Sequence, residues 1–413
     1  MKTKAKTNEP PDHKRIGQIQ ELFVISQEVG SGFPIFLPKG LILREQILSY
    51  IVEEKKKRGY QFVWTPHIAK SAIYKKSGHW KKYDAMFNPM ELDKESYVLK
   101  PMNCPHHFQV YLARPRSYKE LPLRISENGT VYRYEKSGEV NGLLRVRALT
   151  IDDTHDFVRE DQIAGEIDNV LELIEEIYQT FGFKKYRAQI STRHSKEKSK
   201  YLGSEEVWEK SEKALVDAVE KRGMKHSIEE GEAAFYGPKI DFMVDDSLGR
   251  EWQLSTCQLD FNQPINFDMT YINESGEKER PAILHTAFLG SVERFIGILI
   301  EHLAGAFPIW LSPVQVKILP ITDRNVEYSN KIIKRLRDEA IRAELDDRSE
   351  TLNAKIRVAQ KEKVPYMLIL GDKEQQNSST SIRLRNGENK NNIKIEDFIK
   401  DIKDKVENKS LDL

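Results

Sequence analysis

The residues in this chain that could do chemistry are arginines in strand-like segments and three widely spaced soft-metal ligands. No Walker A loop, GxGxxG fingerprint, HExxH, GxSxG or CxxC motif is present, which removes the commonest catalytic signatures. The soft ligands are Cys104, His155 and His285. Cys104 is expected in a proline-bounded loop and His285 at the end of an apolar run, and each of these two alone is more often a packed core residue than a ligand. If the three side chains meet, they describe a catalytic zinc site with an open position.

The arginines fall in two segments with strand character. In the segment 131–135, alternation places Arg133 and Glu135 on one face of a strand. A guanidinium held on a sheet can bind a phosphate or a carboxylate through two parallel hydrogen bonds. For an isolated pair of this kind, a cross-strand ion pair is the more common explanation.

The segment 145–157 favours the binding site over the ion pair. Its alternate positions form one face of a regular strand, and they are Arg145, Arg147, Leu149, Ile151, Asp153 and His155. Cations followed by a carboxylate and an imidazole are costly in a core, so this face suits a polyanion site with the acid and the imidazole deeper in. A solvated surface is the alternative.

The elements that must position these residues indicate an α+β protein. Helices are expected at 41–58, 163–177, 204–222 and 290–305, the last with Ser291 as N-cap, and strands at 60–65, 131–135, 145–157, 239–244 and 251–261. Strands that follow one another without regular helical crossovers favour an antiparallel sheet with helices packed on it. After residue 313, strands and helices alternate, which predicts a small α/β domain of about 100 residues.

Composition adds broad limits. The 413 residues allow two or three domains. The net charge of +1 means that any contact with nucleic acid must come from local basic patches. Two cysteines cannot form a disulfide framework, which suits a reducing cytoplasm. No apolar run is long enough to cross a membrane. The polar, basic residues 1–10 predict a short disordered leader without a secretory signal.

Several motifs, taken in order, resemble the threonyl-tRNA synthetases. They are DHKRIG, FLPKG, SGHW, KPMNCP, YRYEKSG, GLLRVR, DDTHDF, AAFYGPKIDF, QLDF and GSVERFIG. The resemblance covers residues 11–310 as a class II catalytic domain and residues 311–413 as an anticodon-binding domain. It implies an antiparallel class II sheet, a homodimer, and ATP-dependent transfer of L-threonine to tRNA(Thr).

The resemblance also implies roles for individual residues. The zinc ligands match Cys104, His155 and His285, and the threonine-binding residues match Asp153, Tyr236 and Gln258. ATP, with Mg²⁺, would be held by Arg133, Glu135, Arg145, Gln253, Thr256 and Arg294. His79 matches a residue of the transfer step, Lys239 another active-site position, and Arg357, Glu374 and Arg383 residues that read the anticodon.

The sequence departs from this pattern at three positions. Ile151 stands where a glutamine is expected beside the substrate, His106 replaces a glycine and adds an imidazole near the proposed metal, and Ser349 replaces an asparagine expected to help read the anticodon. About ten residues precede the matched core, which leaves no room for an editing domain. Since zinc cannot reject the hydroxyl of serine, serine activation without correction in cis is expected.

Two rival interpretations remain at this stage. Another class II specificity is one of them: the zinc ligands argue against proline, whereas serine is harder to exclude because of Ile151. The other is a non-catalytic RNA-binding relative, which would not need Arg133, Arg145 and Arg294.

Overall fold

The computed structural model describes residues 10–197, 200–201 and 204–413. Nine of the ten positions of the expected leader lie outside the described residues. Within the described residues, no helix is both long and apolar enough to span a membrane.

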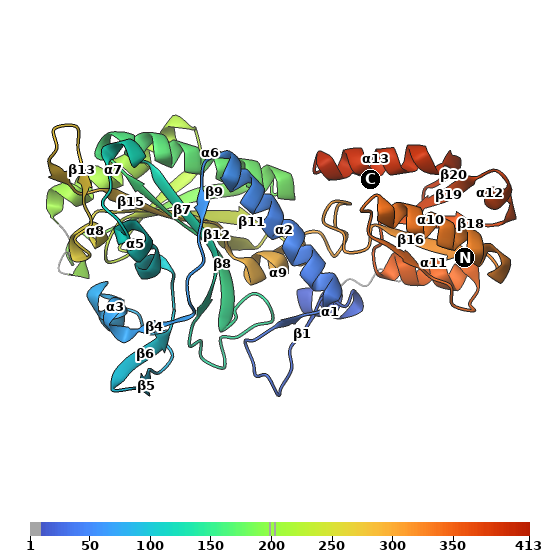
Figure 1. Ribbon diagram of the computed structural model, residues 1–413, viewed down its shortest axis with the longest axis horizontal. Helices are drawn as coiled ribbons and strands as arrows, with labels where there is room; N and C mark the ends of the chain where they lie inside the picture. The colour runs from blue at the N-terminus through green and yellow to red at the C-terminus, as the bar shows by residue number, and fades with distance from the viewer. Residues whose placement is uncertain (1–9, 198–199, 202–203) are drawn as a thin grey trace.

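The larger part of the chain is built on one twisted sheet (Figure 1). Its strands, in spatial order, are β10 (His226–Glu230), β9 (Tyr186–Thr192), β11 (Lys239–Asp245), β12 (Glu251–Asp260), β15 (Ala282–Ser291), β8 (Ala148–Val158), β7 (Leu123–Tyr132) and β3 (Gln61–Phe62). The outermost pair at each edge is parallel, and every pair between them is antiparallel. The predicted antiparallel sheet with flanking helices is confirmed.

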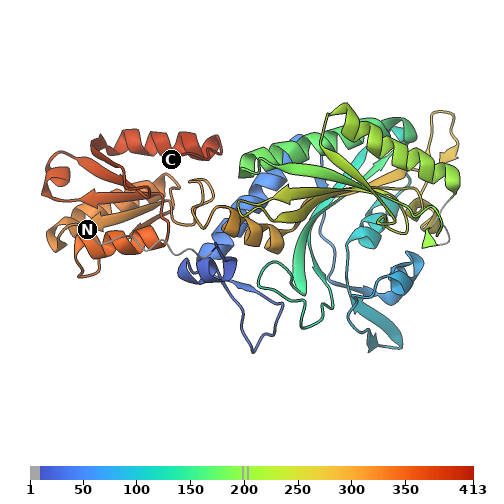
Figure 2. The same ribbon diagram turned by 180° about the vertical axis from the view of Figure 1, so that it is seen from behind.

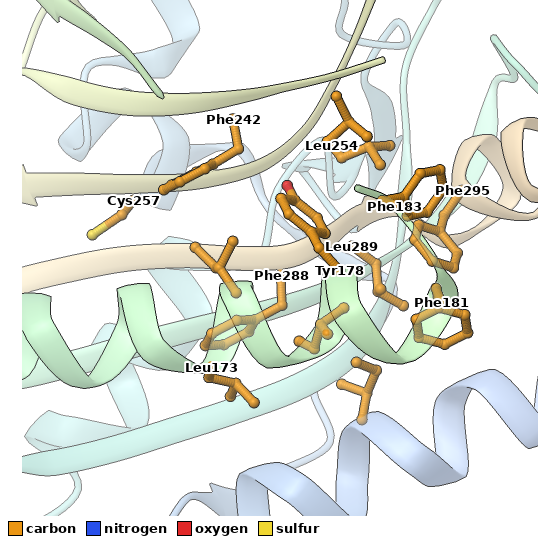
Figure 3. Close-up of a cluster of buried hydrophobic side chains, with 14 of the residues drawn as sticks. Leu173, Tyr178, Phe181, Phe183, Phe242, Leu254, Cys257, Phe288, Leu289 and Phe295 are labelled. Carbon is orange, nitrogen blue, oxygen red and sulfur yellow. The ribbon is translucent and has the colours of Figure 1, made fainter. Parts of the chain in front are cut away.

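Helices cover one face of this sheet and close the main hydrophobic core. They are α2 (Pro38–Lys57), α6 (Ile163–Phe181), α7 (Glu205–Lys221) and, at the end nearer the C-terminal part, α1 (His13–Ile19) and α9 (Val292–His302). Figure 3 shows part of this core, where Tyr178 and Phe181 of α6 lie against Phe242, Phe288 and Phe295. Burying these aromatic side chains is the main force that fixes α6 on the sheet.

The opposite side of the sheet carries smaller elements. A three-stranded sheet is formed by β4 (Ile68–Lys70), β6 (Glu95–Leu99) and β5 (Met90–Leu92), with α3 (Ser71–Lys76), α4 (His79–Lys82) and α5 (Cys104–Leu112) beside it. The remaining short pieces are the pairs β1 (Phe23–Val24) with β2 (Ile35–Phe36) and β13 (Tyr271–Ile272) with β14 (Lys278–Glu279), and α8 (Gln263–Asn266).

The C-terminal part forms a second sheet with its own core, seen at the other end of the molecule in both ribbon views (Figures 1 and 2). Its strand order is β17 (Ala343–Leu345), β16 (Val316–Pro320), β18 (Tyr366–Leu370), β19 (Ser379–Leu384) and β20 (Asn389–Lys394). Its helices are α10 (Val326–Asp338), α11 (Leu352–Lys361), α12 (Asp372–Gln376) and α13 (Ile395–Glu407). The predicted α/β character is confirmed, while the division between residues 310 and 311 stays a prediction.

Two local predictions about the arginine segments and Cys104 are wrong. β7 ends at Tyr132 and β8 begins at Ala148, so Arg133, Glu135, Arg145 and Arg147 all lie in the connection between them. The Arg147 guanidinium donates to the backbone carbonyls of Glu135 and Ser31. Cys104 is not in a loop but is the first residue of α5, where Pro105 suits the first helical turn.

Candidate active site

A cleft of about 500 Å³ opens on the face of the sheet opposite α6. The side chains of β8, β12 and β15 form one wall. The segments around α4 and residues 234–236, the start of α5, the connection between β7 and β8 and the start of α9 line the rest. Most of the predicted catalytic-domain residues line it: His79, Cys104, Arg133, Glu135, Arg145, Asp153, Tyr236, Gln253, Thr256, Gln258, His285 and Arg294. Lys239 and His155 are outside the lining.

The three predicted metal ligands come together at the inner end of the cleft. Potential ligand atoms of Cys104, His155 and His285 all lie within 4.8 Å of one another, and all three residues are buried. The antiparallel register of β8 and β15 pairs His155 with His285, and their ring centroids are 4.6 Å apart. Directly opposite side chains on neighbouring strands must lie this close, so the sheet itself brings the two imidazoles together.

One nitrogen of each histidine is left over for a metal. Among the described residues, His155 Nε2 and His285 Nδ1 are buried nitrogens without a hydrogen-bond partner. Their other ring nitrogens are engaged: His155 Nδ1 lies 2.8 Å from His107 Nδ1, and His285 Nε2 lies 3.0 Å from Asp260 Oδ2. Leaving two buried nitrogens unpaired is costly unless a ligand occupies the space between them.

The hydrogen-bond chain behind His155 fixes its tautomer. His107 Nε2 lies 3.2 Å from Glu127 Oε2, and a carboxylate can only accept. His107 therefore carries its proton on Nε2 and accepts at Nδ1, so His155 donates from Nδ1 and keeps a lone pair on Nε2. Burial would raise the pKa of Glu127, but bonds from His107 and Thr65 and the charge of Lys100 lower it to about 2.

The protonation of His155 agrees with a cation at this corner. Burial and the neighbouring imidazoles of His285 and His107 lower the pKa of His155 well below its usual range, which keeps it in the neutral, ligating form. Burial raises the pKa of the Cys104 thiol, and only a strong positive charge would favour the thiolate in that position. Two lone pairs and a thiol in one dry corner fit Zn²⁺ better than a hard cation.

Asp153 lies between the metal corner and the open cleft. Its Oδ2 accepts from Asn103 Nδ2 at 3.0 Å, and its Oδ1 is 3.9 Å from His155 Nδ1. The Tyr236 ring lies 5.4 Å from that of His285, and Gln258 is anchored through Nε2 to the carbonyl of Gly237. This corner can therefore receive a small ligand that has a positively charged group and a metal-binding oxygen.

The outer part of the cleft is cationic. Arg133, Arg145 and Arg294 all line it, and burial together with the charges of Arg133 and Arg145 lowers the pKa of Arg294. Arg294 donates from Nε to the carbonyl of Leu144 at 2.9 Å, which leaves its other nitrogens for a ligand, while Arg145 lies 2.7 Å from Glu135. Crowded guanidinium groups repel one another, so this arrangement favours a bound polyanion.

The remaining predicted residues differ in how directly they reach the cleft. Gln253 and Thr256 line it from β12, and Gln253 Nε2 donates to Asp241 at 2.7 Å. Lys239 does not line it, because its ammonium group is held by the same Asp241 at 2.6 Å. His79 begins α4 with Nδ1 2.7 Å from Ser77 Oγ, and burial lowers its pKa to about 4, which keeps the imidazole neutral.

Several residues around the metal corner were missed by sequence reasoning. Asn103, His107 and Asp260 contact the proposed ligands or Asp153, and Glu127 contacts His107. Helical spacing could have singled out His107, because it lies three residues after Cys104. The extra imidazole of His106 is outside the ligand group and packs edge-on against Tyr74.

The predicted anticodon residues share one side of the C-terminal sheet. Arg383 is directly opposite Met367, whose side chain faces α11, and Arg357 is exposed on α11. Glu374 accepts from Ser381 Oγ, two residues before Arg383, and also from the backbone N–H of Gly371. Both oxygens of Glu374 are thus already used in the fold. Ser349 is exposed before α11.

Comparison with known proteins gives the family. Residues 87–303 match the tRNA synthetase class II core domain (G, H, P, S and T), and residues 315–405 match an anticodon binding domain. A solved structure titled as the RNA binding domain of threonyl-tRNA synthetase from Cryptosporidium parvum Iowa II is 35% identical. It superposes with a TM-score of 0.90, over 95% of this chain and 98% of that one. The chain belongs to the threonyl-tRNA synthetase family.

Other members of the threonyl-tRNA synthetase family extend this likeness. A putative threonyl-tRNA synthetase from Aeropyrum pernix is 28% identical, with a TM-score of 0.84 over 97% of both chains. The threonine–tRNA ligase of Chloroherpeton thalassium is 48% identical over 97% of this chain, and that of Thermus thermophilus is 48% identical over 91%. The chain spans 62% and 57% of the lengths of these two relatives. A prolyl-tRNA synthetase from Cryptosporidium parvum, 18% identical with a TM-score of 0.71, shares the fold alone.

Proposed function

We propose that this chain activates L-threonine with ATP and transfers the threonyl group to the 3′ end of tRNA(Thr). The observation that carries the proposal is the three-ligand corner of Cys104, His155 and His285, with Asp153 beside it and three arginines farther out in the same cleft. One end suits an amino acid with a hydroxyl group and the other a nucleoside triphosphate. A non-catalytic RNA binder would need neither.

In the activation step, a threonine carboxylate oxygen attacks the α-phosphorus of ATP and pyrophosphate leaves. Arg133 binds the α-phosphate and the threonine carboxylate, which holds the reacting atoms together and offsets the charge that develops. Arg145 binds the γ-phosphate, and Arg294 stacks on the adenine while reaching the phosphates. Glu135, Gln253 and Thr256, which line the same cleft, position the nucleotide, and Mg²⁺ would neutralise part of the charge on the phosphates.

Selection of threonine follows from the metal corner. Zn²⁺ held by Cys104, His155 and His285 would supply coordination positions for the amino group and the side-chain hydroxyl of the substrate. Asp153 accepts from the amino group, and Tyr236 and Gln258 shape the pocket. Valine is nearly isosteric with threonine, so an apolar pocket would separate the two weakly, whereas a required hydroxyl rejects valine strongly.

Transfer to tRNA needs residues of the cleft and of the C-terminal part. His79, neutral at physiological pH, assists passage of the threonyl group to the terminal adenosine, and Lys239 acts indirectly by holding Asp241 beside Gln253. Arg357, Glu374 and Arg383 read anticodon bases, which are recognised by hydrogen bonds to their exposed edges and by stacking. The active form is a homodimer, and a cytoplasmic location stays a prediction.

An amino-acid panel in ATP–pyrophosphate exchange, with metal analysis of the same sample, tests the proposal. We expect exchange with threonine, about one zinc per chain, and discrimination against valine of at least 10⁴-fold, as sites that require a hydroxyl achieve. If folded, zinc-loaded protein shows no threonine-dependent exchange, the proposal is wrong and the chain is better explained as a non-catalytic RNA-binding protein.

Serine is the informative member of that panel. Because serine offers the same amino and hydroxyl groups as threonine, the proposed metal corner can reject it only through the missing methyl group. A missing methyl group is worth roughly 10- to 200-fold. Serine-dependent exchange should therefore be measurable at high serine concentration, and its absence would contradict selection by metal coordination alone.

A further inference from the structure

His13, which lies outside the catalytic cleft, connects three parts of the molecule. It is the first residue of α1 and is 1% exposed. Its backbone N–H and its Nδ1 both reach Glu301 Oε1 of α9, at 3.0 and 2.6 Å. Glu301 is held in turn by Arg250 at its other oxygen.

The other ring nitrogen of His13 holds the connection between β7 and β8, residues 133–147. The backbone N–H of Leu143 donates to His13 Nε2 at 3.2 Å. The backbone N–H of Leu143 can only donate, and the Glu301 carboxylate can only accept. The imidazole must therefore carry its proton on Nδ1 and accept at Nε2. This neutral tautomer satisfies both partners at once.

Two glycines leave the space that this contact requires. A Cβ on Gly142 would lie 2.1 Å from His13 Nε2, and a Cβ on Gly297 of α9 would lie 3.0 Å from Leu144 Cδ2 and 3.7 Å from His13 Cδ2. Gly142 also has a φ of +52°, which side chains other than glycine rarely adopt. The His13 imidazole, the 133–147 connection and α9 are therefore in direct contact, with no room for a side chain at either glycine.

This unit ends on the cationic side of the cleft. The residue after Leu143 is Leu144, whose carbonyl accepts from Arg294 Nε at 2.9 Å, and the next residue is Arg145. Both arginines line the cleft, and Arg294 lies on α9, the helix that carries Glu301. His13 thus fixes the backbone that orients one arginine and carries the other.

We propose that His13 is a positioning residue for the nucleotide, acting through Leu143, Leu144 and Arg294. The inference rests on the proposed function, since it assigns ATP to the end of the cleft that these residues form. Loss of the Leu143 contact lets the 133–147 connection shift, so that Arg145 and Arg294 no longer meet the phosphates together. The threonine end, which β8 and β15 build, keeps its geometry.

A metal is the alternative role for this cluster, because side-chain atoms of Asp12, His13 and Glu301 also lie within 4.8 Å of one another. Both ring nitrogens of His13 already have hydrogen-bond partners, and one oxygen of Asp12 accepts from the backbone of Arg15. A metal would have to displace these bonds. The existing hydrogen bonds explain the cluster without an ion.

Two substitutions of His13 test the hydrogen bonds of its two ring nitrogens separately. His13→Asn places an amide nitrogen where Nδ1 was, which keeps a donor for Glu301 and removes the acceptor for Leu143. His13→Gln reaches the place of Nε2, which keeps an acceptor for Leu143 and removes the donor for Glu301. His302→Asn is the matched control, because His302 lies on the same helix α9 and also accepts a backbone N–H, that of Ser247.

The measurements are KM for ATP and for threonine in pyrophosphate exchange, the fraction of active sites by burst titration, and the dissociation constant of ATP by calorimetry. We expect His13→Asn to raise KM and the dissociation constant for ATP roughly tenfold, the size of one lost hydrogen bond. KM for threonine and the active fraction should stay within about twofold of the unsubstituted chain. His13→Gln should recover most of the ATP affinity, and His302→Asn should change neither constant.

Other outcomes overturn the inference. If His13→Asn leaves ATP binding unchanged, or if both His13 variants lose ATP and threonine binding equally together with active sites, His13 is only a structural residue. Failure of the proposed function gives a different result, because the unsubstituted chain would then bind ATP without threonine-dependent exchange. The dissociation constants of ATP for the unsubstituted chain and the His13 variants would still test the inference. An unsubstituted chain that binds no ATP would overturn both.

Discussion

Ile151 lies in the cleft lining between Leu149 and Asp153, on the strand that carries the proposed metal ligand His155. Its side chain packs against the apolar cluster of Val131, Val146 and Leu149, so it joins that cluster to the cleft. A glutamine, the residue expected here from the family resemblance, would add a polar group next to Asp153 but lose this packing.

We expect Ile151→Gln to lower KM for threonine several-fold, because one new hydrogen bond of about 1 kcal/mol to the substrate is gained. The unfolding temperature should fall by a few degrees, since roughly 1–2 kcal/mol of packing is lost. Exchange kinetics and thermal unfolding measure the two effects. Ile151→Val, which stays apolar, is the control, and an unchanged KM in the glutamine variant would show that position 151 does not contact the substrate.

His107 is the second residue whose environment makes a specific prediction. It stands between His155 and Glu127 and fixes which nitrogen of His155 keeps its lone pair. We expect His107→Phe to weaken zinc binding by roughly 10- to 100-fold, as loss of the partners behind metal ligands commonly does. Competition with a chromophoric chelator measures this directly, without reference to activity.

His67→Asn is the control for the zinc measurement, because His67 is a half-buried histidine of the same domain whose Nδ1 lies 2.8 Å from the Tyr132 hydroxyl instead of from a proposed ligand. Unchanged zinc affinity in a folded His107→Phe variant would mean that His155 is oriented by the strand alone.

At the scale of elements, the junction of α1 with α9 should influence stability in acid. Burial alone would raise the pKa of Glu301, but hydrogen bonds from His13 and Arg250 outweigh it and lower the pKa to about 2. A carboxylate with a depressed pKa stabilises the fold above its unfolded value of about 4.3 and loses that contribution as the pH falls toward 2.

The free energy of unfolding should therefore fall more steeply below pH 4.5 in the unsubstituted chain than in Glu301→Gln, by at most about 1.4 kcal/mol per pH unit. Urea unfolding followed between pH 7 and pH 3 measures the difference between the two curves. Glu172→Gln, an exposed position on α6, should follow the unsubstituted chain. Parallel curves for Glu301→Gln would refute the assignment of the acid sensitivity to this junction.

At the scale of the whole molecule, the two sheets are expected to divide the reaction between them. Arg383 is on the α11 side of the C-terminal sheet and bonds Asn389 at 3.1 Å, whereas the cleft proposed to bind ATP is lined by residues between His79 and Arg294. Arg383→Ala should lower kcat/KM for aminoacylation of tRNA(Thr) roughly 10- to 100-fold, as loss of a base contact of about 1–3 kcal/mol implies. ATP–pyrophosphate exchange should be unchanged.

Arg335→Ala is the control for that comparison, because Arg335 lies on α10, which packs on the opposite side of the same sheet, and pairs with Glu396. Equal losses in both arginine variants would indicate a general effect on the domain, and a fall in exchange activity would contradict the division of labour.

The sequence by itself determined the fold class, the family and the long helices, whereas β9, β15 and most of β7 were not predicted. Helical periodicity and the Ser291 cap predicted α6 and α9 to within a few residues, since an amphipathic face repeats locally along the chain. It also singled out Cys104, His155 and His285 as possible ligands, although their spacing could not show that they meet.

Only the tertiary structure decided which groups lie together. The register of β8 against β15 brings His155 to His285, and the end of β7 at Tyr132 moves Arg133 and Arg145 from a strand face into a connection whose place is set by Leu143 and His13. Glu127 and His107 likewise gain their positions from strand pairing and from α5. Contacts of this kind join residues far apart in the chain, and their geometry depends on strand register and burial, which no local pattern of residue types encodes.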